Sequence, residues 1–282
     1  MHFVGFTGIE KPDHVELYLV NNRPSLDLTT GALADQKLTG ANSTIELFKI
    51  YPEAERVDFI KTYAHSQIAT PNNIAALGDG SFYFTNDHGR NKVGWRHEYS
   101  PLIGDGSISY CDKDSKCKRV DIGYRFPNGL ALGKDNLLYV PSTIAGNLQV
   151  YSIEPNKDIK KIHTIKIPYP LDNVTPDANG DLWIATLPDL DASLPGFDDP
   201  VNAKAPAGVI RVRKLGEGEY EVEKMLEDDK GDVLPMTTTV LHDAKTGRLF
   251  LSSVISPYIA VCEPKGLPGA TKDGGKVGHE EL

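Results

Sequence analysis

Short apolar runs alternate with polar turns along most of the chain. Three segments, 71–84, 127–140 and 170–186, repeat one pattern: a polar acceptor, a short apolar run, a turn rich in Gly, Asp or Asn, and a second apolar run. Runs of this length between turn residues predict pairs of β-strands joined by tight turns. Because no segment has a long helical period, the pattern predicts an all-β fold.

The three repeats also share a spacing. In each, an acceptor side chain stands 11 residues before an aromatic one: Asn72 before Tyr83, Asn128 before Tyr139, and Asp172 before Trp183. Equal spacing places the acceptors at equivalent points of repeated hairpins. A cyclic fold gathers such points around its axis.

The strands group in units of four, which is the pattern of a β-propeller with four-stranded blades. The last unit, residues 237–263, has three strands, and we expect no spare strand near the N-terminus to complete it. The sequence therefore predicts about five blades, with residues 1–263 as a single propeller domain and residues 264–282 as a flexible C-terminal tail.

Composition narrows the possible partners. A formal net charge of -9 gives no reason to expect nucleic acid or an anionic membrane surface, and 40% hydrophobic residues suffice for a large core. No run of about 18 apolar residues is present, so we expect no transmembrane segment. The stretch that follows Met1 does not have the pattern of a signal peptide. The oligomeric state is left open.

The cysteines bear on the redox compartment. Cys111 and Cys117 flank a polar turn between two predicted strands, so they could face each other across a hairpin as a disulfide. A pair of reduced thiols is an equal alternative. Cys262 has no evident partner.

The matched acceptors indicate a metal site. Asn72, Asn128, Asp172 and Asn173 supply amide and carboxylate oxygens without clustered His or Cys, which suits a hard cation, calcium above all. The alternative is that these side chains only bond the turn backbone at strand entries. For three positions in one register, the metal is the stronger interpretation.

Histidines supply candidates for proton transfer. His88 follows a predicted strand that ends at the same mouth, although a surface histidine there needs no function. His2 is a weaker candidate. We therefore take Asp172, His88 and His2 as the candidate catalytic residues.

Six blocks of the chain together resemble the serum paraoxonase/arylesterase family, six-bladed calcium propellers grouped with the gluconolactonases. The blocks lie at residues 43–50, 71–74, 82–88, 128–130, 171–184 and 258–263. The resemblance implies a calcium-dependent hydrolase of lactone or aryl ester substrates, in which calcium polarises the ester carbonyl. It implies that Asn72, Asn128, Asp172 and Asn173 hold the catalytic calcium, and that Asn73 stands near a second, structural calcium.

The chain departs from the family pattern in ways that keep other functions open. The family's calcium-binding glutamate from the first blade has no counterpart, and Asn22 stands where the family has a histidine. We expect that an N-terminal segment of about one blade is lacking. One alternative function is a catalytically impaired or non-enzymatic propeller; another is a sugar lactonase of the gluconolactonase type.

Two short signals indicate the secretory pathway. Asn42-Ser43-Thr44 is a glycosylation sequon in a predicted loop. The C-terminal sequence His279-Glu280-Glu281-Leu282 differs by one residue from a retrieval signal of the endoplasmic reticulum. We expect a protein retained in that lumen.

Overall fold

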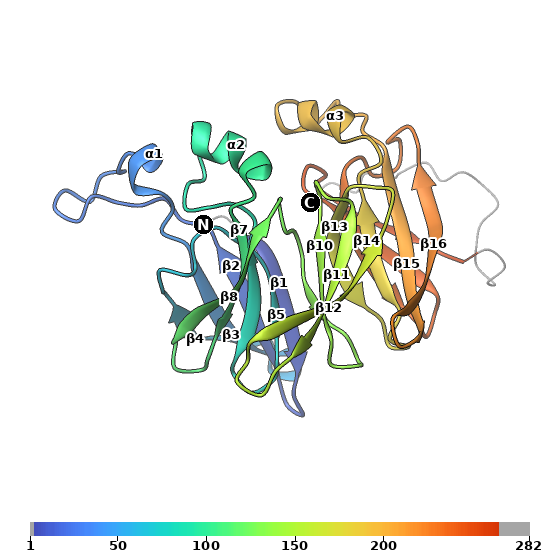
Figure 1. The fold of residues 1–282 in the computed structure, drawn as a ribbon, viewed down its shortest axis with the longest axis horizontal. Helices are drawn as coiled ribbons and strands as arrows, with labels where there is room; N and C mark the ends of the chain where they lie inside the picture. The colour runs from blue at the N-terminus through green and yellow to red at the C-terminus, as the bar shows by residue number, and fades with distance from the viewer. Residues whose placement is uncertain (1–2, 265–282) are drawn as a thin grey trace.

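Five antiparallel sheets stand side by side in chain order, as blades 1 to 5, in a computed structural model that describes residues 3–264 (Figure 1). Four sheets have four strands each; the fifth has three within the described residues. The all-β propeller predicted from the sequence is therefore confirmed, with five blades.

Each blade is a meander whose strands follow one another in sequence. Blade 1 contains β1 (Phe3–Glu10), β2 (Val15–Asn21), β3 (Thr44–Tyr51) and β4 (Arg56–Tyr63). Blade 2 contains β5 (Pro71–Ala76), β6 (Phe82–Asn86), β7 (Gly106–Cys111) and β8 (Cys117–Tyr124). Blade 3 contains β9 (Ala131–Leu132), β10 (Leu138–Ser142), β11 (Asn147–Ile153) and β12 (Ile159–Lys166).

The last two blades continue the pattern. Blade 4 contains β13 (Leu171–Pro176), β14 (Leu182–Thr186), β15 (Ala207–Gly216) and β16 (Glu219–Asp228). Blade 5 contains β17 (Thr237–Asp243), β18 (Arg248–Ser253) and β19 (Ile259–Cys262).

Short helices occupy the connections. They are α1 (Gln36–Thr39), α2 (Trp95–Ile103), α3 (Leu190–Ser193) and the 3-10 turns η1 (Pro52–Ala54) and η2 (Leu194–Phe197). The three α-helices lie at one end of the blades, at the top of Figure 1. None of the described helices has the length and apolar character needed to cross a membrane.

The core lies between neighbouring sheets, where the middle strands meet. All five residues of β6, β10 and β14 are buried, whereas the outer strands β4 and β16 are largely exposed. Between blades 1 and 2, the ring of Phe82 packs 5.5 Å from that of Tyr18 and 4.9 Å from that of Tyr63. Aromatic residues of the apolar runs therefore join adjacent blades.

One strand was not predicted. Gly5 and Gly8 interrupt the alternation of β1, so the pattern near the N-terminus is weak, yet β1 pairs with β2 from Phe3↔Asn21 to Glu10↔Val15. Blade 1 is consequently complete. The expected C-terminal tail lies almost wholly outside the described residues.

Candidate functional site

A β-bulge opens the inner strand of each of the first four blades. In β5 the register shifts between Pro71 and Ile74, and in β13 it shifts between Leu171 and Val174. Bulges re-aim side chains. In the register shifts of β1, β5 and β13, two residues face one on the partner strand: Val4 and Gly5, Asn72 and Asn73, and Asp172 and Asn173. In blade 3, Asn128 and Gly129 take the same place, between the Pro127↔Ser142 bridge and β9.

The bulge pairs of different blades meet. The Asn128 amide lies close enough to Asp172 to lower the pKa of its carboxyl group. Asn73 Nδ2 donates to Asn173 Oδ1 at 2.9 Å, across 100 residues of sequence. The structure thus brings Asn73 to Asn173 and Asn128 to Asp172, whereas the Asn72 side chain contacts Asp87.

Two glycines make this approach possible. A Cβ on Gly129 would lie 2.7 Å from Asn173 Oδ1 and 2.9 Å from its Cα. A Cβ on Gly5 would overlap the carbonyl oxygen of Asn72, and would lie 2.9 Å from the Cα of Asn73. Any side chain at either position would push the bulges apart.

Asp172 is the charged group of this cluster. Its side chain is buried, with 8% of the residue exposed, and it forms no ion pair with the described residues. Burial raises the pKa of Asp172 to about 7, and hydrogen bonds from the Asn173 backbone and the Asn128 amide only partly oppose that rise. A bound cation would stabilise the ionised carboxylate.

Neighbouring groups orient the amides around Asp172. Asn72 Nδ2 lies 3.4 Å from Asp87 Oδ2, and Asn128 Nδ2 donates to Thr143 Oγ1 at 3.2 Å. Because the nitrogen ends are engaged, the Oδ1 atoms of Asn72 and Asn128 are the ends left for a cation. No cluster of three or more His, Cys, Asp or Glu occurs within residues 3–264. The set is one carboxylate with amides, which fits a hard, oxygen-preferring cation of modest affinity.

The residues do not fit a second cation beside Asn73. Its Nδ2 donates to Asn173, and its Oδ1 accepts the backbone N–H of Ile74 at 2.8 Å. Asn173 Nδ2 in turn donates to Thr238 O and Thr239 Oγ1, both at 3.0 Å. Hydrogen bonds of the Asn73 and Asn173 amides thus link blades 2, 4 and 5. They occupy the side-chain atoms with which Asn73 would bind the structural calcium that the family resemblance implies.

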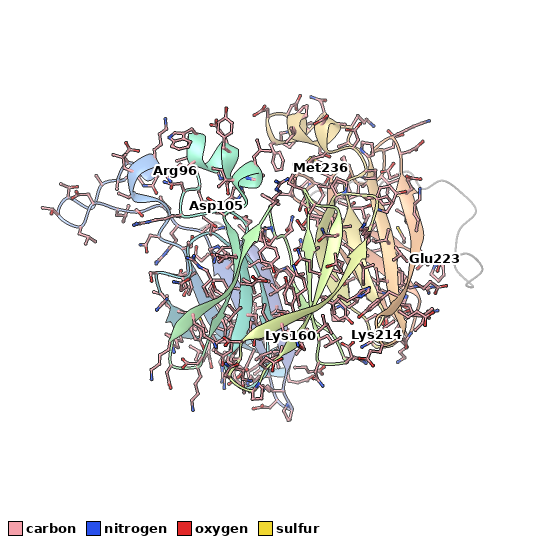
Figure 2. The ribbon with its side chains drawn as sticks, in the orientation of Figure 1. Arg96, Asp105, Lys160, Lys214, Glu223 and Met236 are labelled. Carbon is pink, nitrogen blue, oxygen red and sulfur yellow. A yellow bond between two sulfur atoms is a disulfide. The ribbon has the colours of Figure 1, made fainter. Side chains whose placement is uncertain are left out.

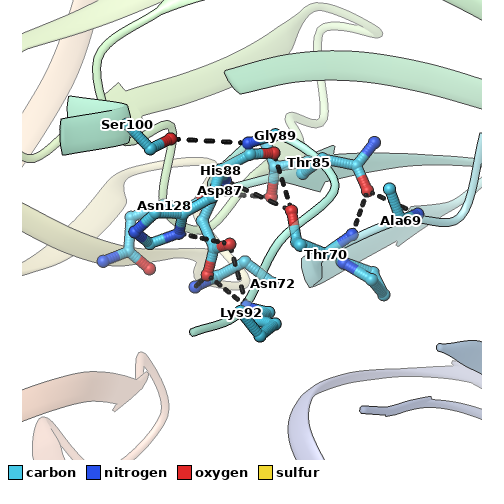
Figure 3. Close-up of polar contacts among 12 residues, drawn as sticks. Ala69, Thr70, Asn72, Thr85, Asp87, His88, Gly89, Lys92, Ser100 and Asn128 are labelled. Atoms are coloured by element: carbon cyan, nitrogen blue, oxygen red, sulfur yellow. Dashed lines mark hydrogen bonds and ion pairs between the residues drawn. The ribbon is translucent and has the colours of Figure 1, made fainter. Parts of the chain in front are cut away.

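A second polar cluster surrounds Asp87 (Figure 3). Its carboxylate accepts from Lys92 Nζ at 2.9 Å and from His88 Nδ1 at 2.8 Å. Burial alone would raise the pKa of Asp87, but the charge of Lys92 and the His88 hydrogen bond outweigh it and hold that pKa well below its usual range. The buried Asp87 therefore forms an ion pair with the partly exposed Lys92 beside Asn72.

The structure describes one of the two candidate catalytic histidines, His88, and also describes Asn22, which stands where the family has a histidine. His88 is buried, with 6% exposed, and its ring stacks on that of His97 at 4.1 Å between centroids. It lines a cavity between blades 1 and 2. His2 lies outside the described residues. Asn22 is fully engaged: its Nδ2 donates to Pro71 O at 3.3 Å and its Oδ1 accepts from Ser43 Oγ at 2.8 Å.

Two remaining predictions concern covalent chemistry. Cys111 and Cys117 form a disulfide across the β7–β8 hairpin, which confirms that alternative over free thiols. Cys262 is a free cysteine on β19. Asn42 is exposed in the loop before β3, so its side chain is accessible for modification.

Sequence reasoning missed the supporting residues around this cluster. Thr143, Asp87 and Lys92 come from loops that follow inner hairpins, where spacing alone assigns no direction to a side chain. The signal that could have identified Asp87 and Thr143 is that each directly follows a buried strand, β6 or β10.

Comparison with known proteins gives a consistent family. A family model described as Arylesterase matches residues 36–259. Serum paraoxonase/arylesterase 2 of Gallus gallus is 26% identical over 244 residues, which are 85% of this chain and 63% of that protein. Serum paraoxonase/arylesterase 1 of Homo sapiens is 27% identical over 219 residues, 76% of this chain and 59% of that protein. The chain thus spans about three fifths of these relatives.

Solved structures agree on the fold. A putative 6-phosphogluconolactonase from Bacteroides uniformis aligns with a TM-score of 0.52 at 11% identity, over 93% of this chain and 68% of that one. At this identity the likeness concerns the fold alone.

Proposed function

Because this chain belongs to the arylesterase family, we propose that it is a carboxylic-ester hydrolase whose centre is the bulge cluster around Asp172, with calcium as its cofactor. The observation that carries the proposal is the buried carboxylate of Asp172, which lies beside the Asn128 amide and the Asn173 backbone and has no basic partner in the described residues. Lactones and aryl esters are the proposed substrates. A six-bladed ring, as the resemblance implies, is part of the same proposal.

When bound, calcium would polarise the ester carbonyl as a Lewis acid. Asp172 would hold the cation together with the oxygens of Asn72 and Asn128. Asn173, also predicted as a ligand, has both ends of its amide hydrogen bonded to Asn73 and to Thr238 and Thr239. The residues behind Asn72 and Asn128 act as positioning groups: Asp87 and Thr143 hold the nitrogen ends of two amides, so that oxygen faces the cation. Since these groups are buried, little reorganisation is needed when substrate binds.

Proton transfer is assigned to His88 as part of the proposal. Its Nδ1 is hydrogen bonded to Asp87, which leaves Nε2 as the atom that would take a proton from water. His2 remains a prediction on the sequence alone.

A secretory location belongs to the same proposal. Disulfides persist in oxidising compartments, and Cys111–Cys117 is one. The exposed Asn42 sequon is compatible with glycosylation there. The C-terminal residues 279–282 lie outside the described residues, so retention in the endoplasmic reticulum rests on their sequence.

The test is hydrolysis of phenyl acetate and of a medium-chain lactone, with and without a calcium chelator. We expect turnover that the chelator removes and added calcium restores. Asp172→Ala should abolish it, while Asp198→Asn, an exposed acid in the loop after α3, should not. Activity that ignores chelation would refute the metal mechanism. Gluconolactone turned over much faster than the aryl ester would favour the sugar lactonase instead.

One observation favours a second candidate, a propeller without catalysis. Asn22 replaces a histidine of the family pattern, and both ends of its amide are hydrogen bonded. An amide cannot act as a base at this place. Calcium binding without turnover of any ester or lactone would support this candidate.

A further inference from the structure

A polar cavity opens at the seam between blades 1 and 2, apart from the bulge cluster. Its volume is ≈ 430 Å³, and its lining includes none of Asn72, Asn128 or Asp172. The lining comes from residues 41–43, 64–69, 86, 88–90, 105 and 107, with Arg119 from β8. It therefore includes His88, the proposed proton-transfer residue, and Asn42 of the predicted sequon. A volume of this size accommodates a small molecule.

The arginines of the chain divide into two groups around this cavity. Four of them form ion pairs with acids: Arg56, Arg211, Arg213 and Arg248. The other five form none with the described acids, and all five lie between residues 23 and 125: Arg23, Arg90, Arg96, Arg119 and Arg125. These five arginines are therefore not held by any described acid and can turn to a ligand, although residues 23–125 carry as many acidic as basic side chains.

Two of these arginines line the cavity and are held in place. The Arg90 stem lies against Gly40, where a Cβ would come within 2.7 Å of Arg90 Cγ. Arg119 Nε donates to Gln67 Oε1 at 3.2 Å. That bond uses one donor and leaves the terminal nitrogens of Arg119 free. A partly anchored guanidinium loses less side-chain entropy when it binds an anion.

One acid, Asp105, lies in the lining beside the two arginines. Asp105, which lies below α2 in the view of Figure 2, accepts a hydrogen bond from Gly89 N at 3.0 Å and another from the Ser100 hydroxyl. Its carboxylate is thus committed to the loop beside the cavity. Against one acid the lining carries two arginines. His65 Nδ1 accepts from Gln67 N at 3.1 Å, so its Nε2 is a further donor.

We propose that this cavity binds the oxyanion of a small hydroxylated molecule, a carboxylate or a phosphate, through Arg90 and Arg119. Guanidinium groups pair with either anion through two parallel hydrogen bonds. The side chains of Ser43, Ser66 and Gln67 supply partners for hydroxyl groups in the same space. The cavity adjoins the proposed centre through His88, but anion binding by Arg90 and Arg119 needs none of Asn72, Asn128 or Asp172.

The experiment is isothermal titration of the full chain at low ionic strength with gluconate, inorganic phosphate and neutral glucose. We expect saturable binding of at least one anion at one site per chain, and none of glucose. Arg90→Gln and Arg119→Gln should each weaken it at least about tenfold, the usual effect of losing a charged hydrogen bond. The matched control is Arg125→Gln, an unpaired exposed arginine outside the lining, which should leave the affinity unchanged.

Binding of gluconate alone would identify a carboxylate ligand, and binding of phosphate alone a phosphorylated one; both results support the site. Three results would overturn it: no saturable binding of either anion, equal binding of glucose, or equal weakening by Arg125→Gln. Circular dichroism of each variant confirms that lost binding does not reflect lost folding.

Discussion

The two glycines of β1 offer a matched pair of substitutions. In Gly5→Ala the new methyl group would overlap the carbonyl oxygen of Asn72 and lie 2.9 Å from the Cα of Asn73. These are backbone atoms of the next inner strand and cannot turn aside. In Gly8→Ala the methyl group meets only the Val15 side chain, at 3.4 Å. Neither glycine has a positive φ, so alanine suits the backbone at both.

The two substitutions should change the free energy of unfolding in opposite directions. Overpacking of this kind costs about 1–3 kcal/mol, and for a domain of this size about 1 kcal/mol shifts the melting temperature by roughly 2–4 °C. Gly5→Ala should therefore melt roughly 2–12 °C lower than the unmodified protein. Gly8→Ala should be neutral or more stable by about 0.4–1 kcal/mol, because alanine restricts the unfolded chain.

The assay is thermal unfolding followed by circular dichroism, together with urea denaturation at 25 °C. Because Gly5 touches the Asn72–Asn73 bulge, its substitution should also weaken calcium binding, whereas Gly8→Ala should not. Equal stability of the two variants would refute the position of β1 as the inner strand of blade 1.

Three further predictions test separate features. For the loop that the Cys111–Cys117 disulfide closes, the chain-entropy relation gives a stabilisation of about 2 kcal/mol. Cys117→Ser should therefore lower the free energy of unfolding, measured by urea denaturation, by that amount. Reductant should lower the free energy of unfolding of the unmodified protein to the same value. Asp177→Ala should cost about 2–3 kcal/mol at pH 7, because Trp183 Nε1 and His242 Nδ1 lose their buried acceptor. Burial works to raise the pKa of Asp177, but the hydrogen bonds from Trp183 and His242 outweigh burial and lower that pKa. The stability difference between Asp177→Ala and the unmodified protein should therefore persist from pH 7 to 5. It should shrink only below about pH 4, where the carboxylate is protonated. Expressed through a secretory pathway, the protein should carry a glycan that endoglycosidase treatment and Asn42→Gln both remove; an unchanged mass in either case would contradict modification at Asn42.

The repeats made much of the fold predictable. An acceptor, an apolar run and an aromatic residue at constant spacing identified the inner hairpins of blades 2 to 4, because a cyclic architecture repeats local patterns. The strand β1 escaped prediction because Gly5 and Gly8 remove the apolar signal. Packing against Asn72 and Asn73 requires glycine at position 5. The residue that weakens the strand pattern in the sequence is thus the one that lets β1 pack against the next blade.

The candidate site was predictable in its residues but not in its contacts. Adjacent acceptors such as Asp172-Asn173 indicated a ligand pair, yet in an ideal strand consecutive side chains face opposite sides. Only the bulge explains how both serve one cluster, and bulges depend on pairing between strands. The ion pair of Asp87 with Lys92 was hidden for a related reason, since it depends on the path of a loop.

The most direct test of the account is calcium binding to the unmodified chain and to Asp172→Asn, measured by isothermal titration in parallel. With one carboxylate in the set, we expect a dissociation constant on the order of 10⁻⁴–10⁻³ M, one site per chain, and loss of binding in Asp172→Asn. Asp198→Asn should bind as the unmodified chain does. Undiminished calcium binding by Asp172→Asn would contradict the placement of the metal at the bulge cluster.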